Sequence, residues 1–349
     1  MQRRLCKSVR AGGLALGGNA PVRVQSMLSR PADDIPANIA QAKVLEAAGC
    51  EIIRAAVPNH AAVALIAALK TTCKVPIVAD IHFDYKLALE SVAAGADKIR
   101  INPGNIGDHA RVKAVADACG QHSVPIRVGV NAGSLEAPLL AQYGKPTPEA
   151  LVESAMRHVR MLERCDFDDI VVSIKSSDVQ TMVRAYRLLA ETCAYPLHLG
   201  VTEAGTTRVG LVKSGIGIGA LLLDGIGDTI RVSLTASPEE EVKAAFLILE
   251  SMRMLPDRPN IVSCPTCGRT KIDLIALTHQ VERALADCRK NITVAVMGCA
   301  VNGPGEAREA DVGLAGGDGC VLLFAKGKAL RKVPENEALQ ALLQEIEHL

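Results

Sequence analysis

The chain has 349 residues, of which 39 are Lys or Arg and 38 are Asp or Glu, giving a formal net charge of +1. This balance argues against binding nucleic acid or an anionic membrane through bulk charge, and an aromatic content of 2% argues against a base-stacking surface. The apolar runs are too short to cross a bilayer, and glycines interrupt the stretch after the basic start, so we expect no membrane span or signal peptide. We expect a cytoplasmic protein whose eleven cysteines stay reduced.

Short β-branched segments alternate with Ala- and Leu-rich helical segments over the first part of the chain. The eight predicted strands are residues 22–26, 52–57, 77–81, 98–101, 126–130, 170–174, 197–202 and 229–234. The predicted helices between them are residues 35–48, 61–71, 86–94, 148–165, 179–193 and 207–213. Eight successive β-then-α units predict a closed (β/α)8 TIM barrel. A doubly wound open sheet is the alternative, but no G-x-G-x-x-G motif follows the first strand.

A second, smaller domain is predicted after the barrel. Ser237-Pro-Glu-Glu-Glu241 is typical of a helix start, with a Ser cap and acids at the positive end of the dipole, and this last barrel helix should end near Met252. Two prolines in residues 255–259 predict a linker. The expected domains are therefore a barrel over residues 1–254 and an α/β domain over residues 260–349. In the second domain we predict strands at 260–263 and 293–297, a helix at 273–288 and a C-terminal helix from Glu335.

Nearly every predicted barrel strand ends in polar side chains, and the carboxyl ends of the strands form the site in this fold. Several are cations, which repel one another in one cavity unless an anion binds there. Guanidinium groups match phosphate oxygens in bidentate geometry, so we infer a phosphorylated ligand, with a diphosphate favoured. The alternative is that these cations pair with Asp80, Glu203 or surface acids. The five cations are Arg54, Arg100, Arg127, Lys175 and Arg231.

Other strand-end residues suggest acid–base or supporting roles. Glu203 follows Thr202 at a predicted strand end, where it could donate a proton in a closed, dry site or pair with an arginine. His82 and His198 are candidates for acid–base groups, phosphate donors or supporting hydrogen-bonding residues. The glycines of residues 215–219 suggest either a phosphate-cradling loop or a flexible connection.

Three cysteines in the second domain predict a metal or cluster site. Cys264 and Cys267 form a C-x-x-C motif, and Cys299 lies in a Gly-rich segment that lets the backbone approach a bulky ligand. The spacing leaves the fourth ligand open among Glu306, Cys320, Cys288 and a substrate. A redox dithiol and a structural zinc are alternatives, although an iron–sulfur cluster with one weaker ligand fits this surround best. We interpret the other eight cysteines as small buried side chains.

Eight ordered motifs carry a resemblance that covers essentially the whole chain. They are Val24-Gln-Ser-Met27, Val78-Ala-Asp-Ile-His-Phe-Asp84, Arg100-Ile-Asn-Pro-Gly-Asn-Ile-Gly107, Val128-Gly-Val-Asn-Ala-Gly-Ser-Leu-Glu136, Leu197-His-Leu-Gly-Val-Thr-Glu-Ala-Gly205, Gly225-Ile-Gly-Asp-Thr-Ile-Arg-Val-Ser233, Cys264-Pro-Thr-Cys267 and Gly298-Cys-Ala-Val-Asn-Gly-Pro-Gly-Glu306. With these motifs the chain resembles the 4-hydroxy-3-methylbut-2-en-1-yl diphosphate synthase family of the non-mevalonate isoprenoid pathway, in its compact bacterial form. Residues 28–31 depart from the family pattern, and no role is carried over to them.

The resemblance implies reductive ring opening of 2-C-methyl-D-erythritol 2,4-cyclodiphosphate, with two electrons and loss of water, to the allylic diphosphate. It implies a [4Fe–4S] cluster on Cys264, Cys267, Cys299 and an exchangeable Glu306, with Glu203 as proton donor. It also implies a homodimer in which one subunit's cluster domain caps the other's barrel, and flavodoxin or ferredoxin as electron donor. The residues implied to hold the diphosphate are Arg54, Arg100, Arg127, Lys175, Arg231 and Ser233, with His82, Asn102, Asn131, His198 and Thr202 close by.

Two other classes of function remain open beside this one. A barrel lyase or hydrolase acting on a phosphorylated metabolite, with a structural zinc in the small domain, would be colourless. A non-enzymatic iron–sulfur assembly or carrier protein would not need the cations at the strand ends. A radical S-adenosylmethionine enzyme is disfavoured, because the C-x-x-x-C-x-x-C triplet is missing.

Overall fold

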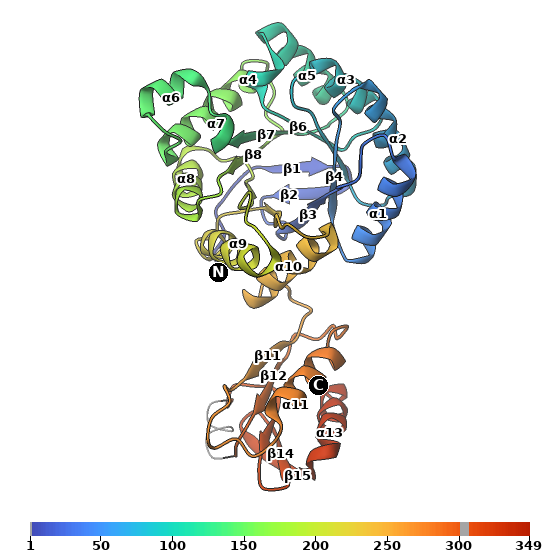
Figure 1. The fold of residues 1–349 in the computed structure, drawn as a ribbon, viewed down its shortest axis with the longest axis vertical. Helices are drawn as coiled ribbons and strands as arrows, with labels where there is room; N and C mark the ends of the chain where they lie inside the picture. The colour runs from blue at the N-terminus through green and yellow to red at the C-terminus, as the bar shows by residue number, and fades with distance from the viewer. Residues whose placement is uncertain (1, 301–306) are drawn as a thin grey trace. The chain divides into compact units, whose positions relative to one another are not determined.

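The computed structural model describes residues 2–300 and 307–349, which fall into two compact units, Met1–Ile248 and Leu249–Leu349. The first unit is the predicted TIM barrel, a ring of parallel strands with helices around it (Figure 1). The second is a five-stranded sheet with two helices packed on it. None of the helices in the described part of the chain combines the length and apolarity that crossing a bilayer requires.

The barrel strands follow one another in space as they do in sequence. They are β3 (Arg23–Met27), β4 (Ile52–Ala56), β5 (Ile77–Asp80), β6 (Lys98–Ile101), β7 (Ile126–Asn131), β8 (Ile170–Lys175), β9 (His198–Leu199) and β10 (Thr229–Ile230). All neighbouring pairs in the order β8-β7-β6-β5-β4-β3-β10-β9 are parallel.

The ring closes between β8 and β9 through few contacts. Val172 pairs with Leu197 in an isolated parallel bridge. The buried Tyr186 hydroxyl accepts the Ile174 N–H at 3.0 Å and donates to the His198 carbonyl. A side chain thus connects the two strands where the backbone ladder is short.

Helices surround the ring, and polar caps set where several of them begin. Thr147, for example, accepts the Ala150 N–H, and Pro148 occupies the first turn of the helix that follows. The predicted helices 35–48 and 86–94 are each followed by a glycine in the left-handed region, Gly49 with φ of +90° and Gly95 with φ of +92°. The helical segments are α1 (Ile35–Ala47), η1 (His60–Ala62), α2 (Val63–Thr72), α3 (Tyr85–Ala93), α4 (Pro103–Ile106), α5 (His109–Gln121), η2 (Ala132–Ser134), α6 (Ala137–Tyr143), α7 (Pro148–Glu163), α8 (Val179–Thr192), α9 (Thr207–Leu223) and α10 (Pro238–Ser251).

The interpretation of residues 215–219 as a phosphate loop or flexible connection is wrong, because these glycines lie inside α9. A Cβ on Gly217 would stand 2.8 Å from Val201 Cγ2 and 2.9 Å from Met182 Cε. Gly217 therefore lets α9 pack closely against the barrel, and the helix continues ten residues past the predicted end at Lys213 to Leu223.

A hairpin that the sequence did not predict covers the amino-terminal end of the barrel. Strands β1 (Ser8–Ala11) and β2 (Leu14–Gly17) pair antiparallel, and in Figure 1 they lie across the middle of the ring. Their buried side chains pack against Ile52, Val78 and Val171, which are first or second residues of three barrel strands. The hairpin thus closes this end with apolar contacts and leaves the opposite end open.

The second unit contains three strands that the sequence did not predict. Its sheet has the order β11-β12-β13-β14-β15, with the first two pairs parallel and the last two antiparallel. Helices α11 (Leu274–Ala284) and α13 (Ala338–Glu347) pack on one face. The strands are β11 (Asn260–Ser263), β12 (Thr293–Met297), β13 (Val312–Gly316), β14 (Cys320–Ala325) and β15 (Lys328–Pro334), and a short turn η3 (Glu335–Glu337) precedes α13.

Candidate active site

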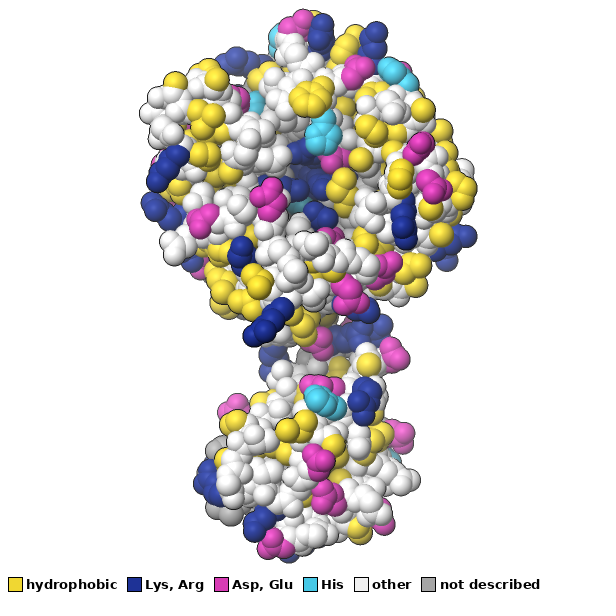
Figure 2. All heavy atoms as spheres, in the orientation of Figure 1, with side chains coloured by type: hydrophobic (Ala, Val, Ile, Leu, Met, Phe, Trp, Pro, Cys, Tyr) yellow, Lys and Arg dark blue, Asp and Glu magenta, His cyan; other side chains and the backbone are white. Residues whose placement is uncertain are grey.

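A cavity of about 500 Å³ opens at the carboxyl ends of the barrel strands. Figure 2 shows Lys and Arg side chains gathered in the hollow at the centre of the barrel. Seven of the predicted site residues line it: Arg54, His82, Arg100, Asn131, Lys175, Thr202 and Glu203. The cavity lies where the barrel fold predicts a site, and its cations favour an anionic ligand.

One carboxylate holds the arginines of the cavity in place. Asp80 Oδ1 lies 3.1 Å from Arg100 Nη1, and Asp80 Oδ2 lies 3.6 Å from Arg54 Nε, with all three side chains buried. Burial opposes ionisation of Asp80, but Arg54, Arg100 and Arg127 outweigh it and hold its pKa well below the usual range. A single carboxylate cannot neutralise both of its arginine partners, so positive charge remains available to a ligand.

Lys175 supplies further positive charge at the end of β8. It lines the cavity. Burial, followed by repulsion from Arg54 and Arg127, lowers the pKa of its ammonium group. An anionic ligand would remove that repulsion and favour the charged form.

Arg231 at the other side of the barrel has a carboxylate partner that the sequence did not predict. Its guanidinium binds both oxygens of Glu241 at 3.1 Å and donates to Ser233 Oγ at 2.7 Å. Glu241 belongs to the acidic start of α10, which we had interpreted only as complementing the helix dipole. Neither Arg231 nor Ser233 lines the cavity, and Asn102 is buried as the cap of α4.

Two of the predicted site residues, Arg127 and His198, lie below the cavity in what we call the inner polar layer. Its members are buried, and each has a side-chain polar atom without a hydrogen-bond partner among the described residues. Arg127 Nη1 donates to Gln25 Oε1 at 3.3 Å across the barrel, and His198 Nδ1 lies 2.7 Å from Thr229 Oγ1. Burial, with repulsion from Arg127, lowers the pKa of His198. The layer consists of Gln25, Lys98, Arg127, Ser173 and His198.

Glu203 combines exposure with a strained backbone. It lines the cavity beside Thr202, and its φ of +51° lies in the left-handed region, which costs a non-glycine residue about 1 kcal/mol or more. Such strain persists when the surrounding structure fixes the residue, and it is frequent at functional positions. The observation supports Glu203 as a functional residue.

Several cavity residues escaped the sequence analysis. Ser176 and Ser177 line the cavity between Lys175 and the start of α8, and Ser134 reaches it from η2. Met27 Sδ lies 2.7 Å from Arg54 Nη2. The sequence did offer a signal for Ser176 and Ser177, because they form a run of serines directly after the strand-end cation Lys175.

The three cysteines predicted to hold a cluster follow the ends of two neighbouring parallel strands. Cys264 follows β11 and Cys299 follows β12, whose residues Ser263 and Val296 are paired. The Gly298 N–H points at Cys264 Sγ at 3.1 Å. Hydrogen bonds from Arg269 lower the pKa of the exposed Cys267. Thiols that accept N–H groups and ionise readily are suited to iron–sulfur ligation.

The fourth predicted ligand, Glu306, lies outside the described residues. Within residues 2–300 and 307–349, no three Cys, His, Asp or Glu side chains are close enough to hold one metal ion. In a cubane cluster each ligand binds a different iron, so the ligand atoms do not need to meet around one ion.

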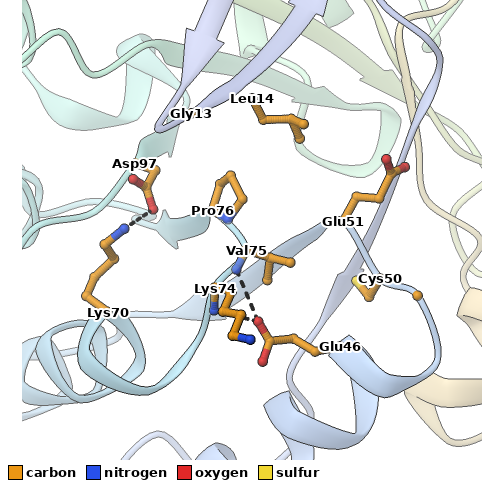
Figure 3. Close-up of a pocket in the computed structure, with 11 residues that line it drawn as sticks. Gly13, Leu14, Glu46, Cys50, Glu51, Lys70, Lys74, Val75, Pro76 and Asp97 are labelled. Atoms are coloured by element: carbon orange, nitrogen blue, oxygen red, sulfur yellow. Dashed lines mark hydrogen bonds and ion pairs between the residues drawn. The ribbon is translucent and has the colours of Figure 1, made fainter.

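A second pocket, of about 400 Å³, lies at the amino-terminal end of the barrel near the β1–β2 turn (Figure 3). Two of its acidic side chains have partners within the pocket. Lys70 Nζ lies 2.7 Å from Asp97, and Glu46 accepts the backbone N–H groups of Lys74 and Val75. This end of a TIM barrel generally serves stability, so the cavity at the carboxyl ends is the better candidate.

The fold and the site define a TIM-barrel protein with a cavity lined by cations, followed by a domain in which three cysteines follow two strand ends. The chain belongs to the GcpE family. The GcpE TIM-barrel domain matches residues 6–246, and the GcpE protein C-terminal domain matches residues 260–348.

Relatives extend over the full length of the chain. A protein of Clostridium perfringens is 52% identical over 99% of both chains, and one of Geobacter sulfurreducens is 53% identical over 98% of this chain and 97% of its own. Both are named 4-hydroxy-3-methylbut-2-en-1-yl diphosphate synthase (flavodoxin). The family resemblance inferred from the sequence is thus confirmed.

Two solved structures resemble part of the chain. Dihydropteroate synthase of Burkholderia cenocepacia superposes with a TM-score of 0.51 at 18% identity, covering 71% of this chain and 99% of its own. The 3-dehydroquinate dehydratase of Geobacillus kaustophilus gives 0.51 at 15% identity, covering 72% and 99%. At these identities the likeness establishes the TIM-barrel fold and nothing further.

Proposed function

We propose that this protein opens the ring of 2-C-methyl-D-erythritol 2,4-cyclodiphosphate reductively, giving (E)-4-hydroxy-3-methylbut-2-enyl diphosphate in isoprenoid precursor biosynthesis. The observation that carries the proposal is the full-length identity of 52% and 53% to relatives named for this activity. The cavity supports it, because Arg54, Arg100 and Lys175 offer more positive charge than Asp80 neutralises.

The barrel residues bind and orient the substrate in this proposal. Arg54, Arg100 and Lys175 bind the diphosphate oxygens, while His82, Asn131 and Thr202 donate or accept hydrogen bonds in the same cavity. The remaining proposed substrate-binding residues are Asn102, Arg127, His198, Arg231 and Ser233. Arg127 and His198 support the cavity from below, and Glu241 orients Arg231 toward Ser233.

Glu203 donates the proton that the departing oxygen requires. Its carboxyl is exposed at the cavity wall, where it can reach a bound substrate. The strained backbone fixes the carboxyl at the cavity wall.

Cys264, Cys267, Cys299 and Glu306 hold a [4Fe–4S] cluster in this proposal. Such a cluster, when bound, supplies the two electrons of the reaction. The Gly298 N–H stabilises negative charge on Cys264 Sγ, and the Arg269 hydrogen bonds do the same at Cys267. Flavodoxin or ferredoxin delivers the electrons, and the chain works in the cytoplasm as a homodimer.

Metal analysis and electron paramagnetic resonance on anaerobically purified protein test the cluster. We expect brown protein with about four irons per chain, as a [4Fe–4S] cluster requires. Colourless protein with stoichiometric zinc would contradict the proposal and favour a lyase or hydrolase.

Glu203→Gln tests the proton donor. Turnover should be lost while the iron content stays unchanged, and Glu191→Gln, at an exposed position on α8, should retain activity. Loss of iron in Glu203→Gln would assign Glu203 a structural role.

Lys175→Met tests the diphosphate site. Loss of a charged hydrogen bond should weaken binding of the cyclic diphosphate by about 1.5–3 kcal/mol, and Lys86→Met, at an exposed position on α3, should not. Unchanged binding in Lys175→Met would favour an iron–sulfur carrier without a substrate cavity.

A further inference from the structure

Lys98 is the member of the inner polar layer that no role yet explains. It lies two residues before Arg100 on β6, so side-chain alternation directs both into the barrel. Lys98 is fully buried, and its Nζ has no hydrogen-bond partner among the described residues. Aliphatic side chains usually fill this part of a TIM barrel. A lysine here needs a physical reason.

No carboxylate of residues 2–300 and 307–349 contributes to the electrostatic environment of Lys98. The charged groups that act on it are Arg127 of β7 and Arg54 of β4, both cations. His198 faces it from β9, and Gln25 and Ser173 of the same layer are neutral. On β5 and at the hairpin below, the inward side chains are Val78, Val9, Ala11 and Leu16.

Burying an ammonium ion inside the barrel without a counterion costs desolvation free energy that no ion pair offsets. Burial, followed by repulsion from Arg127 and Arg54, lowers the pKa of Lys98 well below its ordinary value. Arg127 experiences the same burial, but a guanidinium starts from a pKa about two units higher. The lysine therefore loses its proton before the arginine does.

We propose that Lys98 is a positioning residue that is neutral beneath the empty cavity and becomes protonated when a diphosphate fills it. The inference rests on the proposed function, because it requires an anionic diphosphate against Arg54 and Arg100. Bound anion cancels the positive potential that those arginines exert on the layer below. The new ammonium ion then repels Arg127 toward the ligand. The cations of the cavity and of the inner polar layer thus respond together to one anion.

Calorimetric titration of the cyclic diphosphate into the intact protein, without reductant, tests this proposal. The two phosphates of the cyclic diphosphate do not titrate near neutral pH, so any protons that the complex takes up from the buffer are bound by the protein. Titration in buffers of different ionisation enthalpy gives their number. We expect the wild type to take up as much as one proton per chain more than Lys98→Met does. Lys113→Met, which removes a surface ion pair on α5, should behave as the wild type.

The pH dependence of the dissociation constant provides a second readout that a purely structural role would not alter. Wild-type affinity should fall with rising pH more steeply than the affinity of Lys98→Met, by as much as one additional factor of ten per pH unit on the alkaline side, because Lys175 responds to the anion in both proteins. Lys98→Gln, which keeps a polar side chain without the charge, should show the same shallower slope and serves if Met disrupts folding. Equal proton uptake and equal slopes in wild type and both variants would overturn the inference alone. Absence of any binding would remove both the inference and the proposed function.

Discussion

Neutralising Glu241 should destabilise the barrel, because this carboxylate is the counterion of Arg231. Glu241 is 4% exposed and accepts hydrogen bonds from Arg231 at 3.1–3.2 Å and from the Leu234 N–H at 2.9 Å. Glu241→Gln keeps the shape but leaves the guanidinium unpaired. Removing one partner of a buried pair costs about 3–5 kcal/mol. The Arg231 side chain is 18% exposed and can be partly hydrated, so we expect a loss near about 3 kcal/mol.

Thermal unfolding followed by circular dichroism measures this loss. For a unit of this size, about 3 kcal/mol corresponds to a fall in Tm of about 6–12 °C. Glu240→Gln is the matched control, since Glu240 is the neighbouring residue on α10 and pairs with Lys243 at the surface. That change should cost less than about 1 kcal/mol. Equal Tm values for the two variants would refute the assignment of Glu241 as a buried counterion.

Two further predictions concern packing and pH. Gly217→Ala should destabilise the barrel by about 1–3 kcal/mol through overpacking against Val201, whereas Gly215→Ala, which meets nothing within 4 Å, should stabilise α9 by about 0.4–1 kcal/mol. Urea titration measures the free energy of unfolding of both variants, and equal changes would contradict close packing at Gly217. Because the pKa of Asp80 is lowered in the folded state, its stabilising contribution is complete above its unfolded pKa of about 4 and is lost as the pH falls below it. Asp80→Asn should therefore be less stable than the wild type at neutral pH and converge with it toward pH 2; a constant difference would contradict this.

The hydrophobic pattern predicted the barrel strands well because their order and local β propensity are written in consecutive residues. The predicted lengths of the last two strands were too great, since β9 and β10 pair over only two residues each. The pattern missed β1, β2 and β13–β15. Glycines lie within or beside these strands, and the backbone uses Gly12 at the β1–β2 turn, with φ of +56°, and Gly316 for a close approach to the Gly298 carbonyl.

The sequence also predicted which residue types gather at the cavity, because alternating strands and helices bring all carboxyl ends to one rim. The sequence could not predict how deep in the barrel each of these side chains lies. Arg100 and Arg127 are paired neighbours on β6 and β7, yet Arg100 reaches Asp80 at the cavity wall while Arg127 extends across the barrel to Gln25. Glu241 was missed for a similar reason, since an acid in a first helical turn faces solvent or core according to how the helix docks.

The sequence by itself determined the barrel, the cations at its open end, the cysteine pattern and the family. These features depend on residue type and spacing, which can be recognised directly in the sequence. Only the tertiary structure decided which charges are paired, which are buried without a partner, and which face the cavity. Those properties depend on distance and desolvation between segments remote in sequence. The net charge of +1 is an average over the chain, and it conceals a barrel interior in which Lys98, Arg127 and Arg54 lie buried together.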